Sequence, residues 1–143
     1  MRKRSVTPVT LTLVGLGLPV LLSAQDVGLR QAADRVQSAW LAHDVAAMVD
    51  GDSVTLRLRG ADEEAGAVSR AQAARILARY LQPASEMALQ IRTVRTAGSG
   101  QGYAEATRRY VIRGTSDPMV ETVLFGFRMT GGRWRLSEVR ITP

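Results

Sequence analysis

A β-hairpin is predicted by residues 123–142, VLFGFRMTGGRWRLSEVRIT. Large apolar side chains occupy alternate positions in its first half and share one face: Val123, Phe125, Phe127 and Met129. Such alternation is typical of a strand with one buried face. Gly131-Gly132 supplies a two-residue turn, because glycine readily adopts the positive φ angles that tight hairpins need. We therefore predict strands over about 119–130 and 133–141.

Two more strands extend this hairpin into a meander. They are expected over about 85–96 and 103–113, bounded by glycine-containing turns at 98–102 and 114–118. Before the meander, the pattern predicts a helix over about 27–42, a short helix over 45–49, a strand over 53–59, a loop over 60–68 and a helix from Ser69 to Pro83. Asp44 suits the N-cap of the short helix, and Ser69 with Gln72 fits a capping box.

Helices followed by a meander favour an α+β layer structure, in which a curved antiparallel sheet wraps on two or three N-terminal helices. In this order of elements the chain resembles the cone-shaped nuclear transport factor 2-like superfamily. LAHDVAAMVDGDSVTLRLRG (41–60), SRAQAARILARYL (69–81) and the final strand 134–141 resemble a domain-of-unknown-function family of short secreted bacterial proteins. The resemblance implies a cystatin-like α+β roll that often holds a small ligand at its open end and often dimerises through its outer sheet face. It implies no catalytic residue.

Residues 1–24 are predicted to be a signal peptide. A basic start at Arg2, Lys3 and Arg4 precedes an apolar run, 9–22, that falls short of the ~20 residues needed to span a membrane. Small residues follow, so cleavage is expected between Ala24 and Gln25. This leaves one domain, 25–143, exported to the periplasm or the medium. Leu22 stands where a small residue is usual, and an uncleaved membrane anchor therefore stays an alternative.

The leader also carries much of the positive charge. The chain has nineteen basic and thirteen acidic residues, and without the three basic residues at its start the net charge falls from +6 to +3. Several arginines alternate with the apolar positions of the strands: Arg57, Arg59, Arg92, Arg109, Arg113, Arg133 and Arg135. They suggest a binder of an anionic polymer or surface, although an aromatic content of 5% leaves few rings for stacking on nucleic-acid bases.

A polar cluster is predicted inside the cone. Arg108 shares its face with Ala104 and Ala106, and setting these alanines across from the two phenylalanines puts Glu121 opposite Tyr110 or Ile112. The candidates for a ligand pocket are Arg108, Tyr110, Glu121, Phe125, Phe127 and Trp40. The alternative is an internal ion pair that satisfies its own polar atoms.

The sequence predicts no catalytic residue, metal site or cofactor. His43, the single histidine, is interpreted as a solvated turn residue, and the chain has no cysteine for zinc or disulfides. The main prediction is a small, non-catalytic binding or accessory module for a small apolar ligand, paired as a homodimer through the partly apolar face of Val120, Thr122, Leu124 and Gly126. An isomerase- or dehydratase-like enzyme with Asp50 or Asp52 as base is the alternative.

Overall fold

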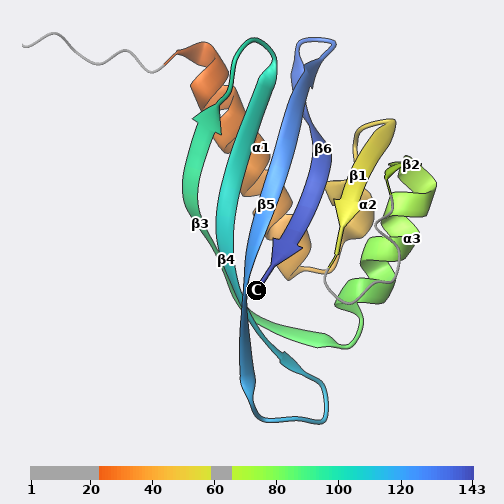
Figure 1. Ribbon diagram of the computed structural model, residues 1–143. Coiled ribbons are helices and arrows are strands. Elements are labelled where there is room, and N and C mark those ends of the chain that lie inside the picture. Colours follow the sequence, from red (N-terminus) through yellow and green to blue (C-terminus); the bar gives the residue numbers. More distant parts are fainter. Residues whose placement is uncertain (1–22, 59–65) are drawn as a thin grey trace, which may run out of the picture.

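One curved sheet and three helices make up residues 23–58 and 66–143, which are the residues that the computed structural model describes. In chain order the elements are α1 (Ala24–Leu41), α2 (Val45–Met48), β1 (Ser53–Arg57), β2 (Ala67–Ser69), α3 (Arg70–Leu81), β3 (Ala84–Thr96), β4 (Gln101–Ile112), β5 (Pro118–Thr130) and β6 (Arg133–Thr142). The sheet curves over α1 (Figure 1), and the predicted α+β class is confirmed.

The strands follow the order β2-β1-β6-β5-β4-β3. The meander β3 to β6 is antiparallel throughout, as predicted, and Gly131 and Gly132 have φ angles of 58° and 75° in its last turn. The sheet is nevertheless mixed, because β1 pairs in parallel with β6. A parallel neighbour needs a long crossover, which here runs through α3 and the rest of the meander.

Two predicted boundaries are wrong. Ala67 and Val68, expected at the end of a loop, belong to the short strand β2, which pairs with β1 and is too short to show alternation. The helix expected from about residue 27 begins at Ala24, because the Ser23 hydroxyl accepts a hydrogen bond from the Asp26 amide (3.2 Å) and caps it. The caps of the other helices, Asp44 and the capping box of Ser69 with Gln72, are present as predicted.

Helix α1 fills the concave side of the sheet. It buries one face: Leu29, Ala32, Ala33, Val36, Ala39 and Trp40. Gly102 on β4 allows a close approach, since a Cβ there would lie 2.5 Å from Leu29 Cδ2. At the start of the helix the Trp134 indole lies beside Gly28 and donates to the Gln25 carbonyl (3.1 Å). The first and last elements of the described chain are thereby joined.

The curvature has a local cause in bulges. β5 and β6 shift register between Gly126 and Phe127, where Ser137 is the extra residue, and β3 shifts twice against β4. A bulge bends its strand and increases the twist. The sheet therefore wraps the helix, and the side chains of its concave face converge.

A substitution at Gly51, just before β1, tests how closely the main chain packs against β6 at this point. A Cβ at this buried position would come within 2.9 Å of the Leu136 carbonyl oxygen, so main chain would have to move. We expect Gly51→Ala to lower the free energy of unfolding by about 1–3 kcal/mol, as overpacking typically does. Gly66→Ala is the control, because nothing lies within 4 Å of its Cβ position. Equal urea midpoints for the two variants would show that Gly51 is not confined.

Candidate functional site

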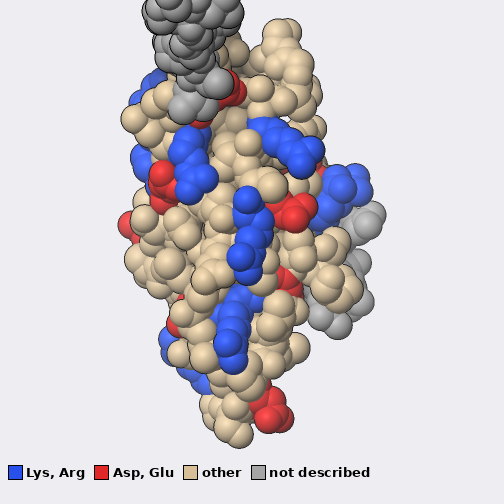
Figure 2. All heavy atoms as spheres, turned by 90° about the vertical axis from the view of Figure 1, so that its left-hand side faces the viewer, with Lys and Arg blue, Asp and Glu red and all other residues tan. Residues whose placement is uncertain are grey.

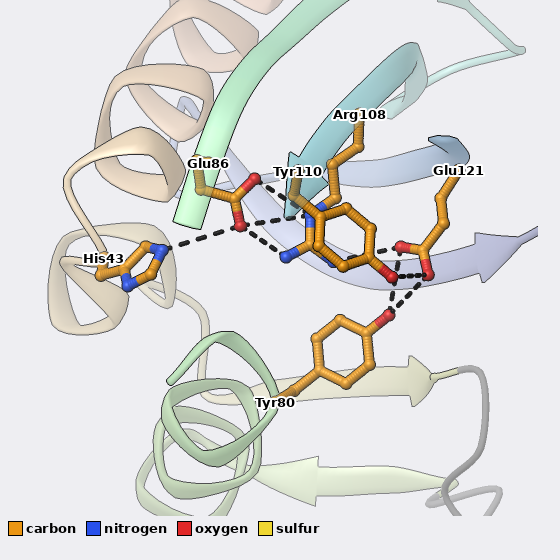
Figure 3. A network of polar contacts seen from close by, with 6 residues as sticks. All are labelled: His43, Tyr80, Glu86, Arg108, Tyr110 and Glu121. Carbon is orange, nitrogen blue, oxygen red and sulfur yellow. Dashed lines mark hydrogen bonds and ion pairs between the residues drawn. The ribbon is translucent and has the colours of Figure 1, made fainter. Parts of the chain in front are cut away.

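A group of polar side chains lies buried beneath the sheet, where the concave faces of β4 and β5 meet. Arg108 and Glu121 have exposures of only 1% and 2%, although both are charged types. They are direct partners in the β4–β5 register, so their side chains leave the sheet side by side. We call the six residues in Figure 3 the buried polar cluster: His43, Tyr80, Glu86, Arg108, Tyr110 and Glu121.

Arg108 is the centre of this cluster. Its Nη1 donates to Glu121 Oε2 (3.1 Å), and its Nε donates to both oxygens of Glu86 (3.2 and 3.0 Å). Its Nη2 also bonds Glu86. One guanidinium thus joins a carboxylate from β3 to a carboxylate from β5, with β4 between them (Figure 3).

Two tyrosines complete the partners of Glu121. The Tyr110 hydroxyl donates to Oε1 (2.8 Å), and the Tyr80 hydroxyl, from α3, lies 3.2 Å from Oε2. The carboxylate therefore accepts from a guanidinium and two phenols. Three donors of the chain itself are thus directed at Glu121, and one of them is a cation.

Aromatic rings enclose the guanidinium. Arg108 Cζ is 3.8 Å from the Tyr110 ring centroid, 5.2 Å from that of Trp40 and 5.4 Å from that of Tyr80. These distances are in the range of cation–π attraction, which is stronger where water is absent. The arrangement is an aromatic cage whose occupant is the chain's own cation.

The environment shifts two pKa values. Burial alone would lower the pKa of Arg108, but its hydrogen bonds to Glu86 and the negative charges of both carboxylates outweigh burial, and the pKa is raised. Burial, with the charge of Glu121, raises the pKa of Tyr80 well above the usual tyrosine range. Arg108 is therefore a fixed cation, and the Tyr80 hydroxyl keeps its proton as a donor.

The cluster has two carboxylates for one guanidinium, and His43 stands at its outer edge. His43 Nε2 lies 3.6 Å from Glu86 Oε1, with the imidazole side chain 27% exposed. The backbone of His43 has a φ of 54°, which is uncommon for a residue with a side chain. His43 lies in the turn after α1, as expected, but its ring is partly buried and directed toward Glu86 (Figure 3).

The structure brings together Arg108, Tyr110 and Glu121, as the sequence suggested. Their register differs from the prediction by two residues: Glu121 is opposite Arg108, and Phe127 is opposite Gly102. A shift of two keeps every side chain on its face, so alternation cannot distinguish the two registers. Whether these residues bind a ligand stays a prediction.

The other three aromatic candidates, Trp40, Phe125 and Phe127, lie in different places. Trp40 borders the guanidinium and makes an edge-to-face contact with Phe125, at 5.6 Å between centroids. The Trp40 Nε1 is buried without a hydrogen-bond partner among the described residues. Phe127 is 2% exposed and belongs to the apolar core. Of these rings, Trp40 is the one that contacts both the guanidinium and another core ring.

Sequence reasoning missed Glu86 and Tyr80 as members of the cluster. Glu86 precedes a register shift in β3, which breaks the alternation that would have assigned its face. Tyr80 lies in the helix that the sequence predicts after Ser69, and only the tertiary structure shows its hydroxyl directed at Glu121.

The aspartates considered as bases lie outside the cluster. Asp50 Oδ1 accepts a hydrogen bond from the Leu136 amide (3.1 Å), and Asp52 is fully exposed, 3.5 Å from Arg70 Nη2. Among the described residues no group of three or more His, Cys, Asp or Glu side chains could hold a metal ion. The buried polar cluster itself offers ion pairing and hydrogen bonding, while Asp50 and Asp52 line a separate hollow.

An open groove lies at the other end of α1, between this helix and the end of β3. Its volume is about 820 Å³, and it is lined by Asp26, Val27, Leu29, Arg30, Gln31, Val94, Arg95 and Thr96. Val27 is 45% exposed. At 1.5 Å per helical residue, Val27 lies about 20 Å along the helix from Trp40, so the groove and the cluster are separate places.

The exposed arginines are interspersed with acids on the side of the molecule shown in Figure 2. Arg30 pairs with Asp34 (3.2 Å) and Arg140 with Glu138 (2.7 Å). On the outer sheet face Val120 is 58% exposed and Tyr103 37%. The predicted anionic partner and the predicted homodimer both stay predictions.

The predicted signal peptide lies almost wholly outside the described residues, which begin at Ser23. Within the described ranges, no helix has both the length and the apolar character needed to cross a bilayer. Export stays a prediction from the sequence.

Comparison with known proteins places the fold. The structure is similar to a ketosteroid isomerase-like protein from Erwinia carotovora atroseptica, with a TM-score of 0.70, 17% identity, and 85% of this chain and 100% of that chain covered. It is also similar to a DUF4783 family protein from Bacteroides uniformis (TM-score 0.61, 13% identity, 76% and 93% covered).

A third similar structure is a proposed dehydratase of the nuclear transport factor 2-like family from Streptomyces avermitilis (TM-score 0.59, 15% identity, 83% and 95% covered). No protein-family model matches the sequence, and no curated protein matches it. At these identities the similarity establishes the shared fold, and it leaves activity to be argued from the residues.

Replacing the central cation tests the cluster. We expect Arg108→Met to lower the free energy of unfolding by about 3–5 kcal/mol, because it leaves two buried carboxylates uncompensated. Adding Glu86→Gln and Glu121→Gln should recover much of this loss, since no buried charge remains. Urea denaturation at neutral pH measures both effects. A triple variant no more stable than Arg108→Met would show that uncompensated carboxylate charge is not the cause of the lost stability.

Alkaline pH tests the burial of Tyr80. Above a pH of about 10 the unfolded chain loses the tyrosine proton while the folded chain keeps it, so stability falls as pH rises, by up to about 1.4 kcal/mol per pH unit. Tyr80→Phe should flatten this decline in urea unfolding between pH about 9 and about 11. An unchanged slope in Tyr80→Phe would show that this hydroxyl does not cause it.

Proposed function

We propose that this chain, which has the nuclear transport factor 2-like fold, is an exported, non-catalytic module that binds a small ligand with an apolar body. The proposal depends mainly on one observation: the buried acid of the cone, Glu121, already accepts from Arg108, Tyr80 and Tyr110. A general base needs a free lone pair within reach of a substrate proton. Here the chain's own donors occupy that position.

The interior of the cone is filled by side chains. Trp40 and Phe125 are 0% and 1% exposed and pack against each other, and the Arg108 guanidinium lies against the Trp40 ring. A small molecule entering there would have to displace an ion-paired cation. The interior therefore supports the fold, and the ligand binds elsewhere.

The groove between α1 and β3 has the composition of a small-molecule site. Val27 and Val94 supply apolar surface, and two arginines, Arg30 and Arg95, stand at its border. Small-molecule sites are typically concave and mainly apolar, with a few polar groups that orient the ligand. The groove suits a molecule with an apolar body and an acidic end.

A fluorescent probe of that chemistry tests the groove. The probe 8-anilinonaphthalene-1-sulfonate combines aromatic rings with a sulfonate, and its emission rises in apolar surroundings. We expect Val27→Asp to weaken its binding about tenfold, through lost apolar contact and repulsion of the sulfonate. Fluorescence titration of the folded protein gives the dissociation constant.

Leu41→Asp is the matched control. Leu41 lies on the same helix and is 43% exposed, against 45% for Val27, but it is at the end of α1 away from the groove. This variant should bind the probe as the unmodified protein does. Equal weakening of probe binding by both substitutions would show that the probe does not bind specifically in the groove, and it would refute the proposed site.

A further inference from the structure

A second hollow, separate from the groove, lies between the start of β1, the start of α3 and the β5–β6 hairpin. Its volume is about 310 Å³. The lining includes three arginines from three elements, Arg70 of α3, Arg128 of β5 and Arg135 of β6. Three hydroxyl side chains, Ser53, Thr130 and Ser137, also line it. Cations and hydroxyl donors therefore surround one small space.

Two of these guanidinium groups are held by the same main-chain oxygen. Arg70 Nη2 and Arg135 Nη1 each donate to the Asp50 carbonyl at 2.9 Å, so the two nitrogens lie within twice that distance of each other. Arg70 Nε donates in addition to the Gly51 carbonyl (3.3 Å). A carbonyl oxygen fixes the position of a guanidinium without cancelling its charge. The two cations are thus oriented and remain charged.

Arg128 adds a third charge. It is opposite Arg135 in the β5–β6 register, and like charges directly opposite each other destabilise a sheet. Within residues 23–58 and 66–143, the side chain of Arg128 makes no hydrogen bond or ion pair. A cross-strand arginine pair beside a third arginine has an electrostatic cost that a bound anion would relieve.

The acids of the hollow compensate this charge poorly. Asp52 lies 3.5 Å from Arg70 but is fully exposed, where water and salt screen the attraction. The Asp50 carboxylate accepts a hydrogen bond from the Leu136 amide (3.1 Å). Among the described residues it makes no ion pair with any of these arginines. The space between the guanidinium groups therefore keeps a positive potential.

We infer that this hollow binds a small oxyanion of the phosphate class, either free phosphate or the terminal group of a phosphomonoester. Guanidinium groups pair with such oxygens through two parallel hydrogen bonds. A dianion with several free oxygens can accept from two or three arginines and from neighbouring hydroxyls at once. This site is separate from the groove at α1, so either can fail without the other.

The test is a titration of the folded protein with inorganic phosphate at constant ionic strength, followed by the backbone amide resonances of Leu136 and Ser137. Saturable shifts at these amides are expected. Arg128→Gln should weaken binding about tenfold, the loss of one charge-assisted contact. Because Arg128 is exposed and unpaired among the described residues, the variant should unfold at an unchanged or higher urea concentration without phosphate.

Arg109→Gln is the matched control. It removes the same charge from an exposed position on β4, opposite Val120 and outside the hollow. Its affinity for phosphate should stay within about twofold of the unmodified protein, because long-range charge is screened by salt. Equal weakening by both variants, or the absence of saturable shifts, would overturn the proposal.

Phenyl phosphate and dimethyl phosphate distinguish the sources of the ligand. Binding of phenyl phosphate as tight as that of inorganic phosphate identifies a phosphomonoester end, and binding of inorganic phosphate alone identifies the free ion. Both results support the site. Dimethyl phosphate has one charge and two blocked oxygens, and it should bind at least about tenfold more weakly. Equal affinity for the diester would overturn the inference.

Discussion

The pairing of one buried guanidinium with two buried carboxylates constrains most of this structure. Arg108 on β4 bonds Glu86 on β3 and Glu121 on β5, so it ties three adjacent strands together on their concave side. Tyr80 extends the tie to α3, and His43 extends it to the turn after α1. Charges taken out of water are tolerated only when such partners are in place. The cluster therefore forms only when the sheet is curved as observed and both α3 and the end of α1 are in place.

The same arrangement separates stability from binding. In a cone fold the concave interior is an obvious place for a ligand, and here a side chain of the protein occupies it. The two binding sites that we propose lie elsewhere: an apolar groove beside α1 and an arginine-lined hollow beside β1. Proteins of one fold differ in function through sites placed on a common framework. This chain illustrates how a framework can fill its central cavity and still keep concave surfaces for recognition.

Much of the fold was predictable, because each element carries local signals. Alternation in 123–142, the Gly131-Gly132 turn and the Ser69 capping box each specify one structure, and all are found. Alternation assigns faces and leaves the register open, which is why Arg108 and Glu121 were placed near each other but two residues out of register. The register shift after Glu86 interrupts the alternation that would have assigned its side chain to the concave face. The positive φ of His43 turns its ring toward Glu86, and β2 is too short for alternation to be visible. These errors share a cause: the deciding contacts join residues far apart in the sequence.

The hydrogen bond from the Trp134 indole to the Gln25 carbonyl has a consequence for maturation. If the leader is removed after Ala24, the capping hydroxyl of Ser23 leaves with it, and a positive ammonium group stands at the start of α1, where the helix dipole disfavours cations. The indole then becomes the contact that holds the newly created first residue against the last strand. Processing would thus remove the cap and keep the contact with the last strand, and precursor and processed chain would differ in how readily the first turn of α1 frays.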